Sequence, residues 1–222
     1  MLYLYNTFAG DPSLVLEGDD HRYIFKVRRH KVDDSLYLRN LEDGLIYRYL
    51  ITQCDKRSAT LMLQESWALE VKAKRRLHIG WCMIDPKSVE KVLPSLNEIG
   101  VSKITFIYCA RSQKSFKPDF KRWEKILLNS SQQSGRSVRM QLQIAEDLEA
   151  FIAQHPQSYL LNFSEHRLSS EMPIDTIVVG CEGGLTGKEI ALFLPQRVVG
   201  FDTPLVLKSE SAVCAVASKM LL

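Results

Sequence analysis

A glycine-rich turn is the first feature of this chain whose residue types could do chemistry. Residues 180–184 read GCEGG, between a short apolar run and the start of a helix. Glycines allow backbone N–H groups to approach a ligand closely. The pattern is not GxGxxG, and it is not a P-loop, because only three residues separate Gly183 from Gly187 and Glu189 stands where magnesium needs Ser or Thr. The turn is either a tight bend or a ligand loop of another kind.

A second segment, residues 206–212 with the sequence VLKSESA, follows closely. We predict a strand that runs into a helix, with Ser209 as N-cap and Glu210 in the first turn, where a carboxylate suits the helix dipole. Alone, this is an ordinary helix start. The rest of the helix is apolar on most sides, and Lys219 is its only charge after Glu210. We therefore expect the helix to be buried, either in its own domain or against a second copy of the chain.

Composition places the chain among globular proteins of the cytoplasm. It has 222 residues, of which 45% are hydrophobic and 25% charged, enough for two domains. We find no run of 18 apolar residues and no basic leader, so we expect no membrane partner. The five cysteines lack CxxC spacing and are expected to be buried free thiols, and the five scattered histidines predict no metal site.

Positive charge is unevenly distributed, although the net charge is only +3. Basic residues gather at 22–31, 72–76 and 111–122, with Arg136 and Arg139 after them. Such clusters can follow a phosphate backbone, or they can simply face solvent.

The pattern of elements changes near residue 72. Before it, short strands are expected, including a hairpin at Asp43-Gly44, and a small β-barrel fits residues 1–71 better than an open sheet. After it, strands and helices alternate, which predicts an α/β domain with a mostly parallel sheet over residues 72–222. The expected strands are 77–83, 104–109, 138–144, 159–163 and 176–179, and the expected helices are 85–99, 120–134, 147–154, 186–194 and 210–222.

These segments together resemble a known family. GCEGGLTGKEI is similar to the GPEGG-(F/L)-(S/T)-x-x-E loop of the SPOUT superfamily, and VLKSESA is similar to its (I/V)-L-R-x-E-T-A segment. Upstream, residues 97–104 resemble TELGV-x-x-I, residues 109–112 resemble the ERS turn, and residues 132–136 resemble EQSGR. KVRR at 26–29 is similar to R-VLR. The set covers nearly the whole chain and resembles the uridine-N3 methyltransferases of 16S ribosomal RNA.

The resemblance implies a fold and an activity. The fold would be a C-terminal SPOUT domain with a deep trefoil knot, preceded by a PUA-like β-barrel that helps to hold RNA; such knots are exceptions to the usual topology rules. The activity would be methylation of N3 of a specific uridine in small-subunit ribosomal RNA, with S-adenosylmethionine as cofactor. The substrate would be the RNA alone or the assembled small ribosomal subunit, and the enzyme would be a homodimer.

The resemblance also implies site residues. A cofactor cradle is expected from Leu161, Gly180, Glu182, Gly183, Gly184, Val199, Gly200, Leu205, Leu207, Ser209, Glu210 and Ala212. RNA contacts are expected from Lys26, Arg28, Arg29, Arg111, Ser112, Gln133 and Arg136. Uracil N3 must lose a proton, so a base or an anion stabiliser is needed, and the candidates are Arg136, Glu182 and Glu210.

The chain departs from the family pattern at several places. Cys181 replaces the usual Pro, Lys208 the usual Arg, Ser211 the usual Thr, and Ser95 the usual Lys. Two alternatives stay open. One is another SPOUT methyltransferase, acting on a ribose 2′-hydroxyl of tRNA or 23S ribosomal RNA, although the Asn-x-x-x-x-Arg segment typical of those enzymes is missing from residues 77–100. The other is a non-enzymatic RNA-binding protein, which would not need the glycine cradle.

Overall fold

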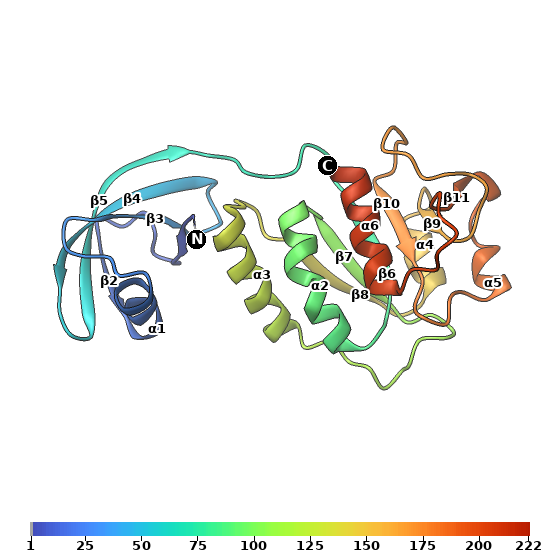
Figure 1. The fold of residues 1–222 in the computed structure, drawn as a ribbon, viewed down its shortest axis with the longest axis horizontal. Coiled ribbons are helices and arrows are strands. Elements are labelled where there is room, and N and C mark those ends of the chain that lie inside the picture. Colours follow the sequence, from blue (N-terminus) through green and yellow to red (C-terminus); the bar gives the residue numbers. More distant parts are fainter. Residues whose placement is uncertain (1) are drawn as a thin grey trace. The chain divides into compact units, whose positions relative to one another are not determined.

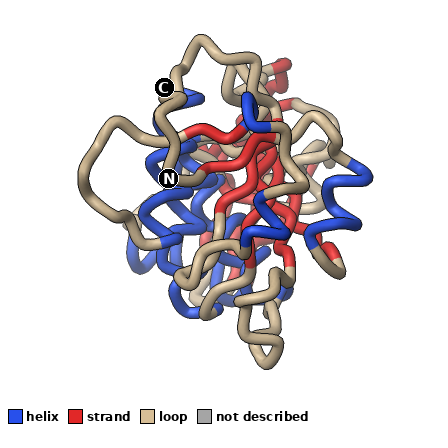
Figure 2. Tube along the Cα trace, turned by 90° about the vertical axis from the view of Figure 1, so that its right-hand side faces the viewer, coloured by secondary structure: helices blue, strands red, loops and turns tan. Residues whose placement is uncertain are grey.

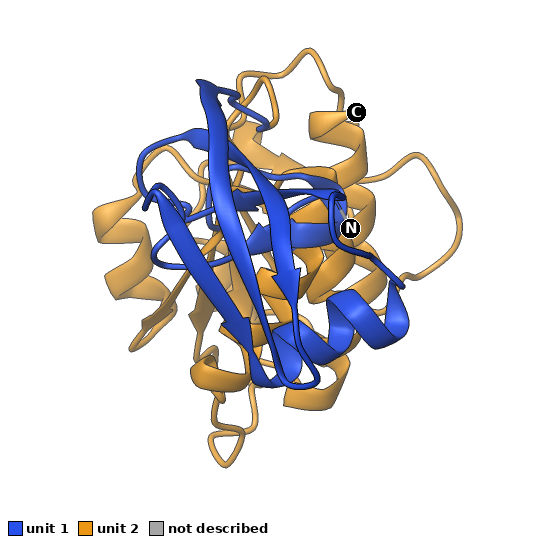
Figure 3. Ribbon diagram, turned by 90° about the vertical axis from the view of Figure 1, so that its left-hand side faces the viewer, with its two compact units in different colours: residues 1–72, 131–139 blue, residues 73–130, 140–222 orange. Residues whose placement is uncertain are grey.

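The computed structural model describes residues 2–222, which form two compact units (Figure 3). The first unit contains the chain up to residue 72 together with residues 131–139. The second contains residues 73–130 and 140–222. The segment 131–139 includes the last turn of a long helix, so that helix begins in the second unit and ends in the first.

The first unit is built on one five-stranded sheet. Its strands are β1 (Leu4–Tyr5), β2 (Ser13–Glu17), β3 (Ser35–Arg39), β4 (Leu45–Cys54) and β5 (Ser58–Ala68), in the order β1-β3-β4-β5-β2. The hairpin predicted at Asp43-Gly44 is confirmed, since it joins β3 to β4. The predicted small β-barrel is not confirmed in the described strands, because the sheet is open and its edge strands β1 and β2 do not pair with each other.

A short helical segment carries part of the first basic cluster. Helix α1 (Gly18–His21) continues directly into the π-helix η1 (Arg22–Val27). Ile24 points from this segment into the core of the sheet and is fully buried, whereas Lys26, Arg28 and Arg29 are exposed. Arg29 adopts a positive φ of 62°, which turns the chain out of the helix.

The second unit contains a six-stranded, entirely parallel sheet, as the alternation predicted. Its strands are β6 (His78–Cys82), β7 (Lys103–Ile107), β8 (Gln141–Ala145), β9 (Tyr159–Leu161), β10 (Thr176–Val179) and β11 (Val198–Val199), in the order β11-β9-β10-β6-β7-β8. All residues of β6 are buried, as expected for a strand covered on both faces. Parallel pairing brings the carboxyl ends of all six strands to one edge.

Helices cover this sheet on both sides (Figure 2). They are α2 (Pro86–Ile99), α3 (Phe120–Ser134), α4 (Leu148–Gln154), α5 (Gly187–Ile190) and α6 (Ser209–Leu221), and a 3-10 turn, η2 (Pro195–Arg197), precedes β11. Helices α2 and α6 pack side by side (Figure 1). The predicted start of α2 is confirmed, because the Asp85 side chain accepts a hydrogen bond from Ser88 N, and Gly100 ends the helix with a φ of 111°.

Helix α6 is buried mainly within its own unit. Its inward face consists of Ala212, Val213, Val216, Ala217 and Met220. Val216 is fully buried and Met220 is 3% exposed. The apolar character of the helix is therefore accounted for by its own domain and does not require a second copy of the chain.

The structure corrects two expectations at the start of α6 and one at α5. Residues 205–207 form no strand, and the N-cap is Lys208 instead of Ser209, with no side-chain cap bond. Helix α5 ends at Ile190 instead of continuing to Leu194, and the chain then passes into η2.

The cysteines are not all free, contrary to expectation. Cys82 and Cys109 form a disulfide with a Cα–Cα distance of 5.8 Å. They come together because β6 and β7 are neighbours in the parallel sheet, Cys82 is the last residue of β6, and Cys109 follows the end of β7 by two residues. Cys54, Cys181 and Cys214 are free thiols.

Across residues 2–222, the helices are all too short or too polar to cross a lipid bilayer. The same part of the chain brings together no group of three His, Cys, Asp or Glu side chains that could hold a metal ion.

Candidate functional site

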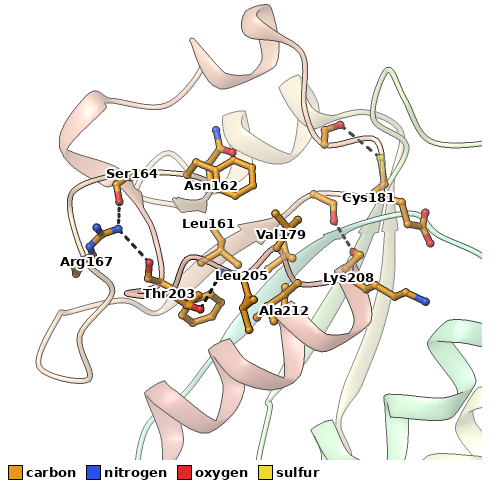
Figure 4. A pocket seen from close by; sticks show the side chains of 18 of the residues that line it. Leu161, Asn162, Ser164, Arg167, Val179, Cys181, Thr203, Leu205, Lys208 and Ala212 are labelled. Atoms are coloured by element: carbon orange, nitrogen blue, oxygen red, sulfur yellow. Dashed lines mark hydrogen bonds between the residues drawn. The ribbon is translucent and has the colours of Figure 1, made fainter.

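A pocket of about 730 Å³ lies at the carboxyl ends of β9, β10 and β11. This is the edge of a parallel sheet where ligands usually bind, and the volume suits a medium-sized organic molecule. Its lining residues come from three segments: the end of β9 and the residues up to Arg167, the end of β10 and the glycine loop, and the stretch from Phe201 to Ala212 that leads into α6. In Figure 4, Leu161, Val179, Leu205 and Ala212 gather around the centre, with Arg167 on one side and Lys208 on the other.

The glycine loop after β10 forms a tight turn. Gly184 N donates to Cys181 O at 2.9 Å, and Gly184 has a φ of 67°, a conformation that favours glycine. The Cys181 side chain is buried beneath the turn, with its Sγ 3.6 Å from Gly184 O. A capping box ends the loop and opens α5, where Thr186 and Glu189 bond each other's backbone N–H groups.

The loop that follows β7 fastens one side of the glycine loop. Arg111 Nη1 donates to Gly183 O at 2.7 Å, and Ala110 N donates to Glu189 Oε1 at 2.7 Å. Burial alone would raise the pKa of Glu189, but hydrogen bonds from Ala110 and Thr186 and the charge of Arg111 together lower it. We call these two hydrogen bonds, from Arg111 to Gly183 and from Ala110 to Glu189, the clasp.

The first residue of α6 fastens the other side. Ser209 Oγ donates to Gly180 O at 2.5 Å and accepts from Trp81 Nε1 at 2.8 Å. Trp81 lies in the middle of β6 and is fully buried, and Ser209 is 5% exposed. The glycine loop is therefore hydrogen-bonded directly to Arg111 of the β7 loop and to Ser209 of α6, and through Ser209 it is linked to Trp81 of β6.

Gly200 marks a close crossing of two backbone segments. A Cβ added there would lie 2.7 Å from Ser164 O and 3.0 Å from Asn162 O. Gly200 N also donates to His166 O at 2.9 Å, and Leu168 N donates to Gly200 O at 2.8 Å. Only glycine allows the segment after β11 to pass this close to residues 162–168.

The rim of the pocket combines charges with exposed apolar side chains. Arg167 Nη1 donates to Ser164 O at 2.8 Å and to Phe201 O at 3.2 Å, which joins two lining segments. Phe163 is 81% exposed and Val206 is 77% exposed, although both line the pocket. Large apolar side chains left open to solvent beside a cavity are typical of a ligand-binding surface.

Eight of the twelve residues predicted for the cofactor cradle line the pocket: Leu161, Gly180, Glu182, Gly184, Leu205, Leu207, Ser209 and Ala212. The other four, Gly183, Val199, Gly200 and Glu210, do not line it. A Cβ on Gly183 would meet Arg111 Cβ at 3.3 Å, and Val199 and Gly200 are buried at the backbone crossing. Glu210 lies in the first turn of α6, where its Oε2 is buried without a hydrogen-bond partner.

The residues predicted for RNA are divided between the two units. Lys26, Arg28, Arg29 and Gln133 belong to the first unit and are exposed. Arg136 belongs to the same unit but is 6% exposed; its Nε donates to Val138 O at 2.9 Å, and burial lowers its pKa to about 10. In the second unit Arg111 is held by the clasp, and Ser112 is buried, with its Oγ accepting from Cys109 N at 3.3 Å.

The sequence prediction missed much of the pocket wall. The lining residues outside the predicted cradle are Asn162, Phe163, Ser164, Glu165, Arg167, Val179, Cys181, Phe201, Thr203, Val206 and Lys208. Position in the chain was the signal that could have found some of them, since residues 162–167 lie at the end of the strand predicted at 159–163 and directly after it. No residue pattern marks them, because they reach the pocket only through the pairing of β9 with β11.

Comparisons with known proteins agree with this geometry. The ribosomal RNA small subunit methyltransferase E of Helicobacter pylori is 34% identical over 222 residues, which is 98% of each chain. The protein of the same name from Aquifex aeolicus is 24% identical over 209 residues, covering 87% of this chain and 88% of its own. A solved structure of the Neisseria gonorrhoeae protein of that name, bound to S-adenosylmethionine, has a TM-score of 0.80 at 16% identity and covers 98% of this chain and 95% of that one.

A second solved structure gives the same fold. A methyltransferase from Legionella pneumophila, in complex with S-adenosylmethionine, has a TM-score of 0.80 at 20% identity and covers 98% of this chain and 95% of that one. The RNA methyltransferase domain family matches residues 71–221. The chain therefore belongs to the RNA methyltransferase family, and its relatives of matching length within that family are the ribosomal RNA small subunit methyltransferase E proteins.

Proposed function

We propose that this protein transfers a methyl group from S-adenosylmethionine to N3 of one uridine in 16S ribosomal RNA. The observation that carries the proposal is the 34% identity, over 98% of both chains, to a protein named as a small-subunit ribosomal RNA methyltransferase. The pocket supports it, because the glycine loop and the segment before α6 line one cavity although about 25 residues separate them in the chain. A protein that only bound RNA by charge would not need such a cavity.

The pocket suits a nucleoside cofactor. Leu161, Val179 and Leu205 supply an apolar floor for an adenine ring, and the backbone of the glycine loop supplies polar groups. Two solved methyltransferase structures of the same fold contain S-adenosylmethionine. Bound here, the cofactor supplies an electrophilic methyl group on a positively charged sulfur, and the pocket walls hold it in a fixed direction.

The protein must also remove a proton from uracil N3. Transfer forms an N–CH₃ bond, breaks an S–CH₃ bond and leaves the N3 proton on a base, so the products are N3-methyluridine and S-adenosylhomocysteine. Glu182 is our candidate base, because it is exposed and lines the pocket. Glu210 does not line the pocket, and we assign Arg136 no step, because its guanidinium is buried against Val138 O.

We further propose that residues 1–71 act as a PUA-like RNA-binding domain and residues 72–222 as the catalytic SPOUT domain. Exposed Lys26, Arg28 and Arg29 would contact phosphates in the RNA or in the assembled small subunit. The close crossing at Gly200 supports a trefoil knot, with residues 162–168 as the loop through which the chain passes. We also propose a homodimer that works in the cytoplasm; light scattering of the purified chain tests the mass.

Mapping of ribosomal RNA by mass spectrometry tests the activity. RNA from a strain that lacks the gene should lose one methyluridine, and the wild-type gene should restore it. The Glu182→Gln variant should bind the cofactor normally in calorimetry but restore the methyl group much more slowly. A deletion strain with a complete set of 16S modifications would contradict the proposal, and a methyl lost instead from a ribose of tRNA or 23S RNA would support the alternative substrate.

A further inference from the structure

A chain of two hydrogen bonds joins the sheet to the glycine loop. Trp81 Nε1 donates to Ser209 Oγ at 2.8 Å, and Ser209 Oγ donates to Gly180 O at 2.5 Å. A hydroxyl group carries one proton to donate, and Ser209 uses it on Gly180 while accepting from Trp81. We call these three groups the Trp81–Ser209–Gly180 relay.

Ser209 does not act as the cap of its helix. The N-cap of α6 is Lys208, and Ser209 is the first residue with helical conformation. Its side chain is therefore not engaged with the orphan N–H groups of α6 that a capping hydroxyl would satisfy. The hydroxyl instead points across to another segment, 29 residues away in sequence.

We propose that Ser209 is a positioning residue that fixes the shape of the cofactor pocket through Gly180. This inference rests on the proposed function, since the pocket is taken to hold S-adenosylmethionine. In a trans peptide the C=O and the next N–H point in opposite directions. A bond that holds Gly180 C=O therefore also holds the direction of Cys181 N–H, and both Gly180 and Cys181 line the pocket.

Trp81 makes the relay rigid. It is fully buried in β6, in the interior of the six-stranded sheet, and its ring packs 5.9 Å from that of Phe106. A donor on this side chain has little freedom to move. The relay therefore fixes the position of the glycine loop relative to the core of the sheet. The pocket thus has its shape before the cofactor binds.

Calorimetry on purified full-length protein tests the proposal. Ser209→Ala leaves the buried Trp81 N–H and the partly buried Gly180 C=O without these partners, so we expect the Kd of S-adenosylmethionine to rise about tenfold. The turnover rate at saturating cofactor should stay within about threefold of wild type, because the lost bond shapes the site before the reaction begins. Ser211→Ala, which removes an exposed hydroxyl from the same helix, is the matched control and should leave Kd unchanged.

A double-mutant cycle separates positioning from general destabilisation. Trp81→Phe removes the relay donor, whereas Trp123→Phe removes an equally buried indole that donates to Glu90. Trp81→Phe combined with Ser209→Ala should weaken cofactor binding no more than the worse single variant, because both break one relay. Trp123→Phe should lower stability without raising Kd; an equal rise in Kd for both tryptophan variants would overturn the proposal.

Amide hydrogen exchange tests the relay without any cofactor. Ser209→Ala and Trp81→Phe should speed exchange of the amides of residues 180–184, and Trp123→Phe should not. If the wild-type protein did not bind S-adenosylmethionine, the proposed function would be wrong. The exchange rates would still show whether the relay holds the glycine loop. Unchanged exchange in Ser209→Ala, with the protein folded, would show that the hydroxyl does not hold the loop.

Discussion

Removing the Glu189 carboxylate should loosen the glycine loop from one side. Its Oε1 accepts from Ala110 N at 2.7 Å, and its Oε2 accepts from Thr186 N at 2.7 Å and from Thr186 Oγ1 at 2.8 Å. A hydrogen bond to a charged group contributes about 1.5–3 kcal/mol, and the loss of a helix cap costs about 1 kcal/mol. Because the side chain is partly exposed, we expect Glu189→Ala to lower the free energy of unfolding by about 2–3 kcal/mol.

Glu189→Gln should cause only part of this loss of stability, because an amide has one acceptor oxygen where the carboxylate has two. The variant can keep the bond to Ala110 or the bonds to Thr186, but not both, so we expect about half of the loss. Urea unfolding at pH 7, followed by tryptophan fluorescence, measures the difference. Glu182→Gln, which changes an exposed carboxylate on the same loop, is the control and should leave stability unchanged.

The pH dependence gives an independent check on Glu189. Its folded pKa is lowered below the ordinary 4.5, so the carboxylate contributes stability above that pH, and the contribution is lost as pH falls through the folded pKa. The difference in free energy of unfolding between wild type and Glu189→Gln should therefore become smaller below about pH 4.5. A gap under about 0.5 kcal/mol at pH 7, or one that does not change with pH, would refute the reasoning.

Three further outcomes are expected. Gly200→Ala should destabilise the second unit by about 3 kcal/mol in urea unfolding, because its methyl group would lie 2.7 Å from Ser164 O. Burial lowers the pKa of His78 to about 3, so this side chain stays neutral in the folded state while it gains a proton in the unfolded state. As pH falls from 6.5 to 5, the free energy of unfolding of wild type should therefore drop by about 2 kcal/mol more than that of His78→Gln, in the same assay. Lys26→Ala with Arg29→Ala should reduce the salt dependence of RNA binding by about one unit per lost phosphate contact, with unchanged cofactor affinity in calorimetry.

The parts of the molecule that rest on local patterns could be predicted from sequence. The helix at 85–99, the parallel strands of the second unit and the helix start near Thr186 each depend on residues a few positions apart. The glycine loop could be located for the same reason. The sequence did not settle features that are decided at a distance, such as the shape of the first sheet, which is open because its two edge strands do not pair.

The roles of single residues were harder to predict, because a residue type does not reveal its neighbours. Gly183 looked like part of the cofactor cradle, yet it backs onto Arg111, 72 positions earlier. Arg136 looked like a phosphate contact, but folding buries it and its backbone carbonyl accepts from Tyr3. Arg167 and Phe163 carry no motif and line the pocket only because of how the strands are ordered.

Three motifs that lie apart in the sequence are joined by hydrogen bonds in the structure. The turn at 109–112 reaches the glycine loop through Arg111, and the segment at 206–212 reaches it through Ser209. One bond holds the carbonyl of Gly183 and the other holds the carbonyl of Gly180, so both ends of a four-residue stretch are fixed by different elements. A change in any of the three segments alters the anchoring of the other two, because the glycine loop has no regular secondary structure of its own to hold its shape. This dependence is a physical reason for the three motifs to occur together in one chain.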